Sequence, residues 1–263
     1  MKDLFSLEGR VALVTGGSRG IGKMIAQGFL EQGAKVYISS RKAPACDQAA
    51  EDLSQYGTCV SLPHDLSTVA GCDALAAELA THEKKLDILV NNAGAAWGAE
   101  FAEYPESGWD KTMDLNVKSL FFMTQKVYAL MKAAASAERP GKVINIASID
   151  GLKVNPWETY SYQASKAAVI HLTRKMASKL VQEDIIMTGI APGAFASTMN
   201  KAARDHEDKV EKGIPAKRIG RPEDMASAAV FLASSAGDYV VGSTIPVDGG
   251  VVNAPGPGTS IDV

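Results

Sequence analysis

A tyrosine and a lysine four residues apart form the most reactive pattern in the sequence. Tyr162 and Lys166 belong to the run Tyr-Gln-Ala-Ser-Lys, which begins fourteen residues after Ser148. Residues four apart share one face of a helix, so the ammonium is expected close to the phenol. A phenol has a pKa of about 10, and one cation about 5 Å away would lower that pKa by about two units. The pattern therefore predicts that Tyr162 acts as a general acid–base.

A glycine-rich segment near the N-terminus is the second candidate site. The segment Thr15–Gly22 reads TGGSRGIG and precedes a helix-like stretch. Glycine lets backbone N–H groups at a helix N-terminus approach an anion, so we expect the pyrophosphate of a dinucleotide here. Gly17–Lys23 also resembles a triphosphatase loop, but the thioether of Met24 cannot replace the Mg²⁺-binding hydroxyl of that loop. A purely structural glycine turn is the other alternative.

Cations follow the second apolar run. Ser39 and Ser40 are followed by Arg41 and Lys42, and Arg19 lies in the glycine-rich segment. In dinucleotide sites an acid at this position binds the ribose 2′-OH of NAD, whereas arginine accommodates the 2′-phosphate of NADP. The pattern predicts NADP(H) as the cofactor, with solvated loop charges as the alternative.

The elements that position these residues alternate along the whole chain. Short β-branched runs occur at Val11–Val14, Val36–Ser39, Cys59–Leu62, Ile88–Val90, Val143–Ile146, Ile185–Ile190 and Thr244–Val247. Helix-like stretches between them include Ile21–Gln32, Ala70–Ala80, Trp109–Met131, Tyr162–Val181 and Pro222–Leu232. Apolar strands that alternate with helices are typical of a parallel sheet covered on both faces. We predict an α/β fold: one Rossmann-type doubly wound domain over residues 1–263, with a parallel sheet of about seven strands.

Two regions interrupt this alternation. Residues 192–221 are charged and lack a clear period, which favours a lid over a substrate site. The tail, residues 253–263, carries two prolines and two glycines and is expected either to extend along the surface, where it would meet another subunit, or to fray.

Composition excludes several classes of protein. The 263 residues carry 27 Lys and Arg against 30 Asp and Glu, and this balance gives no footprint for nucleic acid or an anionic membrane. There is no apolar run of membrane-spanning length and no signal-peptide pattern, so we expect a cytoplasmic protein. The three cysteines and four histidines show no ligand spacing, and no metal site is predicted.

These motifs together resemble the short-chain dehydrogenase/reductase family over essentially the whole length. The resemblance rests on Thr15-Gly-x-x-x-Gly20-x-Gly22, His64-Asp65-Leu66, Asn91-Asn92-Ala93-Gly94, Leu115-Asn116-Val117, Ser148, Tyr162-x-x-x-Lys166, Pro192-Gly193 and Val247-Asp248-Gly249-Gly250. It implies hydride transfer between a nicotinamide and a carbinol carbon, with Tyr162 handling the oxygen's proton.

The resemblance also implies a role for each matching residue. Lys166 would lower the pKa of Tyr162 and bind the nicotinamide ribose, Ser148 would orient the carbonyl, and Asn116 would hold a water linked to Lys166. Asp65 and Leu66 would border the adenine, and Asn92 would lie against the adenosine ribose. Ile190 to Phe195 would line the face of the nicotinamide. Ser197 would lie near the nicotinamide carboxamide, at a position where the family usually has threonine. The full set expected at the cofactor is Gly16, Ser18, Arg19, Gly20, Ile21, Gly22, Ser40, Arg41, Asp65, Leu66, Asn92, Ala93, Gly94, Tyr162, Lys166, Pro192, Gly193, Phe195 and Ser197.

Within the family the chain is most similar to 3-oxoacyl-(acyl carrier protein) reductases, in particular the rhamnolipid type. This implies reduction of a 3-oxoacyl thioester, an acyl carrier protein as a partner, and a homotetramer built on Trp109–Met131 and Tyr162–Val181. Arg139 stands where that branch has a docking cation, but the second such position holds Glu183. Trp97, Trp157, Phe195 and Met199 are candidates for an apolar substrate pocket or for core and interface. The alternatives are a dehydrogenase or reductase of small ketones, sugars, polyols or steroids, and a dinucleotide-sensing protein without turnover.

Overall fold

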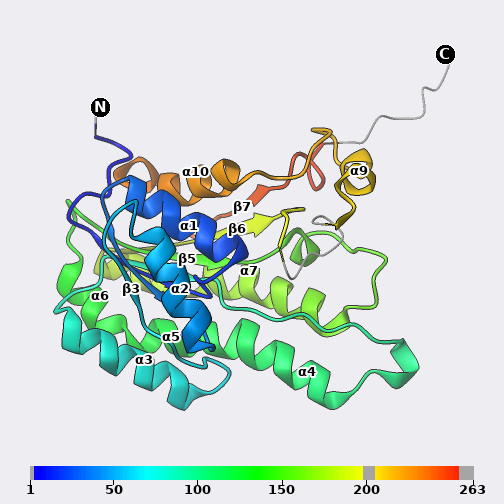
Figure 1. The fold of residues 1–263 in the computed structure, drawn as a ribbon, viewed down its shortest axis with the longest axis horizontal. Coiled ribbons are helices and arrows are strands. Elements are labelled where there is room, and N and C mark those ends of the chain that lie inside the picture. The colour runs from blue at the N-terminus through cyan, green and yellow to red at the C-terminus, as the bar shows by residue number, and fades with distance from the viewer. Residues whose placement is uncertain (1–2, 198–204, 255–263) are drawn as a thin grey trace.

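The computed structural model describes residues 3–197 and 205–254. Within these residues, seven parallel strands form one sheet in the order β3-β2-β1-β4-β5-β6-β7 (Figure 1). The strands are β1 Val11–Thr15, β2 Lys35–Ser39, β3 Cys59–Ser61, β4 Ile88–Asn91, β5 Gly141–Ile146, β6 Ile185–Pro192 and β7 Thr244–Val247. The predicted Rossmann-type sheet of about seven strands is confirmed.

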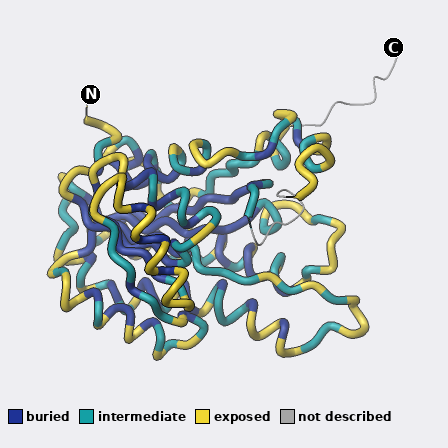
Figure 2. The backbone as a smooth tube through the Cα atoms, in the orientation of Figure 1, coloured by how far each residue is buried: buried dark blue, intermediate teal, exposed yellow. Residues whose placement is uncertain are grey.

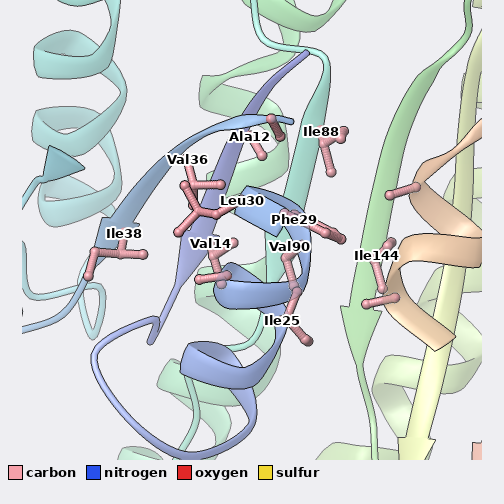
Figure 3. Close-up of a cluster of buried hydrophobic side chains, with 14 of the residues drawn as sticks. Ala12, Val14, Ile25, Phe29, Leu30, Val36, Ile38, Ile88, Val90 and Ile144 are labelled. Carbon is pink, nitrogen blue, oxygen red and sulfur yellow. The ribbon is translucent and has the colours of Figure 1, made fainter. Parts of the chain in front are cut away.

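Helices cover both faces of this sheet. One face packs against α1 Gly20–Glu31, α2 Ala43–Leu53 and α10 Pro222–Ala233, and the other against α3 Val69–His82, α5 Ser119–Lys126, α6 Tyr128–Ala134 and α7 Tyr160–Leu180. Successive strand residues point to opposite faces, so Ala12 and Val14 join the first core cluster and Leu13 joins the second. Figure 3 shows Val14 and Val90 in the first cluster beside Ile25 of α1.

The central strands are the most buried part of the molecule (Figure 2). Every residue of β1, β4, β5 and β6 is buried, as expected for parallel strands that are apolar on both sides. Their carboxyl ends, at Thr15, Asn91, Ile146 and Pro192, meet along one edge of the sheet. In doubly wound sheets ligands bind at this edge, where the strand order reverses between β1 and β4.

The predicted helix Trp109–Met131 is wrong as one continuous element. The structure has α4 Glu106–Met113, a π-helical turn Asp114–Lys118, α5 and then α6, which begins after Val127. Asn116 lies in the π-helical turn, and its amide bonds both backbone groups of Ala95, as described below. π-Turns of this kind are frequent at functional sites, and hydrophobic period alone does not reveal them.

The segment expected to be a lid is only partly within the described residues. Phe195 forms a parallel bridge with Gly220, and the short helix α9 Glu207–Val210 lies between them in the chain. Residues 198–204, with the pocket candidate Met199, and the tail beyond Ala254 fall outside the described residues.

Two negative findings hold for the described part of the chain. None of its helices combines the length and the apolar character that a membrane crossing requires. Its His, Cys, Asp and Glu side chains form no group of three or more that could hold a metal ion.

Candidate active site

Helix α7 brings the tyrosine and the lysine together. The Nζ atom of Lys166 lies 5.6 Å from the centroid of the Tyr162 ring, as expected for residues on adjacent turns of one helix face. Lys166 is buried and its ammonium donates a hydrogen bond to the carbonyl of Ile146, the last residue of β5, at 2.8 Å. The ammonium is therefore fixed at the carboxyl end of the central strands.

Ser148 joins the same site from the loop after β5. Its hydroxyl accepts a hydrogen bond from the backbone N–H of Asp150 at 3.1 Å, which begins a 3₁₀ turn Ile149–Gly151. The Ser148 side chain also acts on the phenol of Tyr162 and lowers its pKa. The structure thus brings together Ser148, Tyr162 and Lys166, three of the four residues predicted to be catalytic.

The pKa of Tyr162 differs from the sequence-based expectation. Burial outweighs the lowering effect of Ser148 and raises the pKa of Tyr162 to about 12, so the net shift is opposite to the predicted one. The physical reason is that the ammonium faces the aromatic ring and donates to Ile146, while the hydroxyl loses hydration. Tyr162 is consequently protonated at neutral pH, which is the form a proton donor needs.

Burial acts on Lys166 in the opposite direction. Loss of hydration lowers the pKa of Lys166 to about 8, and the carboxylate of Asp150 partly opposes this by raising it. Asp150 is the acid whose field reaches both Tyr162 and Lys166, because it lies two residues beyond Ser148. Sequence reasoning missed this residue; a carboxylate in the first turn after the candidate serine was the available signal.

Asn116 is placed by hydrogen bonds on three sides. Its Oδ1 accepts from the Ala95 N–H at 2.8 Å, and its Nδ2 donates to the Ala95 carbonyl and to Ser165 Oγ, each at 2.9 Å. Ser165 in turn donates to the carbonyl of Tyr162 at 2.7 Å. The π-helical turn is thereby tied to α7 beside the tyrosine. Ser165 was missed as a positioning residue, although it lies inside the Tyr-x-x-x-Lys motif.

The glycine-rich segment forms the turn between β1 and α1. Gly16 and Gly20 have φ values of +66° and +53°, which disfavour a side chain. A Cβ on Gly22 would lie 2.3 Å from the carbonyl oxygen of Gly16, so the helix start packs directly on the turn. Ser18, Arg19 and Ile21 complete a loop whose backbone leads into the N-terminus of α1, as a phosphate site requires.

The segment Asn92–Gly94, which follows β4, packs against the glycine-rich turn and bonds its backbone. Asn92 donates from Nδ2 to the carbonyls of Thr15 and Gly16 at 2.9 and 3.1 Å, and the backbone N–H groups of Asn92 and Ala93 donate to Thr15 Oγ1. A Cβ on Gly94 would lie 3.1 Å from Asn116 Oδ1. The predicted contact of Asn92 with a ribose stays a prediction. Thr15 is a further supporting residue that sequence reasoning missed; a polar residue at the end of an apolar run was its only signal.

The end of β2 fits the adenosine side of NADP. The hydroxyls of Ser39 and Ser40 are buried and have no hydrogen-bond partner among the described residues. Arg41 and Arg19 are exposed, and neither pairs with an acid in the part of the chain described. Unpaired guanidinium groups beside unpartnered hydroxyls provide the cations and donors that a 2′-phosphate needs.

The two residues expected at the adenine lie in different environments. Asp65 is exposed, and its carboxylate accepts the Ser67 N–H at 3.0 Å. The side chain of Leu66 is buried in the second core cluster, so Leu66 contributes packing beneath the site, and only its backbone is available to a ligand.

The residues after β6 enclose the opposite end of the site. A Cβ on Gly193 would lie 2.7 Å from Asp248 Cα, so Pro192 and Gly193 pack against the segment after β7. A Cβ on Gly20 would lie 3.3 Å from Ser197 Cβ, which places Ser197 over the glycine-rich turn. Phe195 is 2% exposed and its ring packs against Gly220, beside a pocket that Phe195 lines together with Ile214 and Asp248. Its predicted contact with the nicotinamide stays a prediction.

The chain matches known proteins along nearly its whole length. A family model described as enoyl-(acyl carrier protein) reductase matches residues 16–252. A short-chain type dehydrogenase/reductase from Mycobacterium marinum superposes with a TM-score of 0.89 at 31% identity, covering 97% of this chain and 99% of that one. The chain belongs to the short-chain dehydrogenase/reductase family.

Two relatives with named activities and one solved structure are especially similar. The rhamnolipids biosynthesis 3-oxoacyl-[acyl-carrier-protein] reductase of Pseudomonas aeruginosa is 50% identical over 95% of this chain and 99% of its own. The Pseudomonas aeruginosa RhlG/NADP active-site complex superposes with a TM-score of 0.92 at 49% identity, covering 95% of this chain and 99% of that one. A 2-dehydro-3-deoxy-D-gluconate 5-dehydrogenase of Dickeya dadantii is 39% identical over 94% of this chain and 96% of its own.

The docking positions of this short-chain reductase differ from the expectation of cations beside the cleft. Arg139 donates to the Gly9 carbonyl at 2.9 Å and lies 3.6 Å from Asp87, which precedes β4. It therefore sits at the edge where the strands begin, about 20 Å along β5 from Ser148 at about 3.3 Å per residue. Glu183 pairs with Lys132 and Lys179, which holds its pKa at about 2.

The aromatic pocket candidates of the enzyme separate by exposure. Trp157 is 68% exposed on the loop between Ser148 and Tyr162. Trp97 is partly buried against Gly108, with Lys111 Nζ 5.0 Å from its ring centroid. Of the two, Trp157 has the free apolar surface that a ligand could contact.

Proposed function

We propose that this short-chain reductase reduces the ketone of a 3-oxoacyl thioester with NADPH, using Tyr162 as the proton donor. The observation that carries the proposal is the geometry of Tyr162, whose ring centroid lies 5.6 Å from the Lys166 ammonium and whose pKa responds to the neighbouring Ser148 side chain. When bound, NADPH supplies the hydride that reduces the ketone carbon. The residues of the chain bind, orient and protonate, as follows.

Ser148 and Tyr162 act together on the ketone oxygen. The two side chains are close enough to interact, so a carbonyl oxygen bound between their hydroxyls would receive two donors aimed at the charge that develops during reduction. Tyr162 then releases its proton to that oxygen. The Lys166 ammonium stabilises the phenolate that remains, since opposite charges in a buried site attract strongly.

Several groups of the chain are suited to hold NADP(H). The glycine-rich turn Gly16–Gly22 and the N-terminus of α1 would hold the pyrophosphate, and Arg19, Ser40 and Arg41 the 2′-phosphate. Asp65, Asn92, Gly94, Pro192, Gly193 and Ser197 border the same edge of the sheet and complete the proposed cofactor contacts.

The surface near Ser148 favours an apolar substrate. Val154 and Trp157 are 85% and 68% exposed on the loop after Ser148, and Phe101 is 77% exposed on the loop after β4. The two loops are joined by the Ala99 N–H, which donates to the Glu158 carbonyl at 3.2 Å. Exposed apolar groups gathered beside a site suit an acyl chain better than a sugar.

Sugar acids are the second candidate class of substrate. Gluconate-type dehydrogenases and reductases among the relatives, at 37–39% identity, support this alternative. A protein that only senses the dinucleotide is the non-enzymatic alternative, but the complete set of Ser148, Tyr162 and Lys166 argues for turnover.

The proposal is tested by comparing substrates. We expect steady NADPH oxidation with a 3-oxoacyl thioester, and a kcat/KM at least about tenfold higher than for a free ketone of matched chain length. A ratio near one, or preference for a keto-sugar acid, would contradict the thioester assignment. Absence of turnover with every ketone, despite NADPH binding, would support the sensor.

Three wider expectations belong with this proposal. An acyl carrier protein would present the substrate, but without Arg139 as a docking cation beside this subunit's Ser148. A homotetramer would use the surfaces of α4–α6 and α7. A cytoplasmic location is supported by Cys46, Cys59 and Cys72, all of which are unbridged.

A further inference from the structure

A cavity beside the catalytic serine loop contains a lysine that the reaction does not use. It has a volume of about 290 Å³ and is lined by Lys153, Gly213, Pro215, Val251, Val252, Asn253 and Ala254. The walls come from three segments: the turn after Ser148, the region before Gly220, and the segment after β7. None of these lining residues is acidic, so the cavity carries one uncompensated positive charge.

Lys153 is held in place through its backbone while its charge stays available. Its N–H donates to the Ile149 carbonyl at 2.8 Å, which continues the 3₁₀ turn that begins at Ser148. Its ammonium contacts only the Val251 carbonyl, at 3.4 Å, and pairs with no acid among the described residues. A lysine with three donors and a single long contact has most of its hydrogen-bonding capacity left.

The cavity is coupled to the catalytic residues on two sides. A Cβ on Gly151 would lie 2.5 Å from the backbone of Lys166, so the turn that carries Lys153 packs directly on α7. The opposite wall follows Asp248, which packs against Gly193. Ser148 and Lys153 lie five positions apart in sequence, on either side of the 3₁₀ turn Ile149–Gly151.

We propose that Lys153 and this cavity bind an anionic group that the substrate carries away from its reacting ketone, namely the phosphate of the pantetheine arm of an acyl thioester. The inference rests on the proposed thioester reduction. Lysine is a well-suited point charge for phosphate. The phosphate and the carboxylate share one chemistry, and the experiment below distinguishes them.

The test uses two substrates that differ only in the phosphate. We would measure kcat/KM for a 3-oxoacyl phosphopantetheine and for the same 3-oxoacyl pantetheine without phosphate. For the wild type we expect the phosphorylated substrate to be preferred by about fivefold or more, entirely through KM. In Lys153→Gln that preference should fall to about one, while kcat and the kinetics of the unphosphorylated substrate stay unchanged.

Matched variants and salt complete the experiment. Lys153→Arg should keep most of the preference, and Lys84→Gln, which alters an exposed lysine before β4, should keep all of it. Added sodium chloride should weaken the preference of the wild type and leave Lys153→Gln unaffected, because salt screens exposed charges.

Three results have distinct meanings. A wild-type preference near one, or a preference that survives in Lys153→Gln, would overturn the phosphate site while leaving thioester reduction intact. An effect of Lys153→Gln on the KM of a keto-sugar acid alone would also overturn it and assign the lysine to a carboxylate. If the wild type reduces neither thioester, the proposed function itself fails.

Discussion

The pKa values of Tyr162 and Lys166 are shifted more by burial than by the nearest charged group. The Lys166 ammonium lies 5.6 Å from the Tyr162 ring centroid, yet the pKa of Tyr162 rises to about 12 because its hydroxyl is desolvated. The same burial lowers the pKa of Lys166 to about 8. At neutral pH the pair is therefore a neutral phenol beside a cation, the combination required for donating a proton.

The pH dependence of ketone reduction follows from the directions of these two pKa shifts. As the pH rises through about 8, Lys166 loses its proton and can no longer stabilise the phenolate, whereas Tyr162 remains protonated. We expect kcat/KM for ketone reduction to fall by about tenfold per pH unit above the pKa of Lys166. A profile measured with saturating NADPH that stays flat from about pH 7 to about pH 10 would argue against this role of Lys166.

Substitution of Asp150 should shift the alkaline limb of the pH profile of kcat/KM. Its carboxylate raises the pKa of Lys166, so Asp150→Asn removes a stabilising charge and the limb should shift to lower pH. A merely structural role for Asp150 would change kcat without moving the limb. Glu138→Gln, at an exposed position before β5, is the matched control and should leave the profile unchanged.

The cations at the end of β2 should control cofactor choice. Arg41 is exposed and pairs with no acid among the described residues, so its substitution leaves no buried charge behind. We expect Arg41→Ala to raise the KM for NADPH by about tenfold, the value of one charge-assisted contact, and to leave the KM for NADH within about twofold. Equal effects on both cofactors would show that Arg41 does not contact the 2′-phosphate.

At the scale of elements, the glycine-rich turn depends on close backbone packing. A Cβ on Gly22 would lie 2.3 Å from the Gly16 carbonyl oxygen, whereas a Cβ on Gly213 would meet no atom within 4 Å. Gly22→Ala should lower the free energy of unfolding by about 1–3 kcal/mol and weaken NADPH binding. Gly213→Ala should be nearly neutral in both denaturant unfolding and cofactor titration; similar losses in the two variants would contradict the packing argument.

The strands could be predicted from the sequence, whereas one helical irregularity could not. The seven strands follow from short β-branched runs, since each is a local pattern that burial on both faces dictates. The π-helical turn around Asn116 does not, because its side chain bonds Ala95, which lies 21 residues earlier and outside any helical pattern. The burial of the Phe195 ring is likewise a tertiary effect, because it depends on packing against Gly220.

At the scale of the whole molecule, exposed apolar side chains predict association. Trp109 on α4 and Phe121 on α5 are 43% and 37% exposed, on the helices expected to form the subunit interface. We predict a homotetramer with a mass in light scattering of four times 27.7 kDa. Phe121→Asp should reduce that mass by placing a charge in the interface. A wild-type monomer would contradict the assembly.

The central claim is that a protonated Tyr162 donates the proton in an NADPH-dependent ketone reduction. Its most direct test is the Tyr162→Phe variant, which removes one hydroxyl from a site whose packing is otherwise unchanged. We predict that kcat with a 3-oxoacyl thioester falls by at least about 100-fold, while the Kd for NADPH from calorimetry stays within about threefold of the wild type. A variant that keeps more than a few per cent of the wild-type kcat would remove Tyr162 from the mechanism.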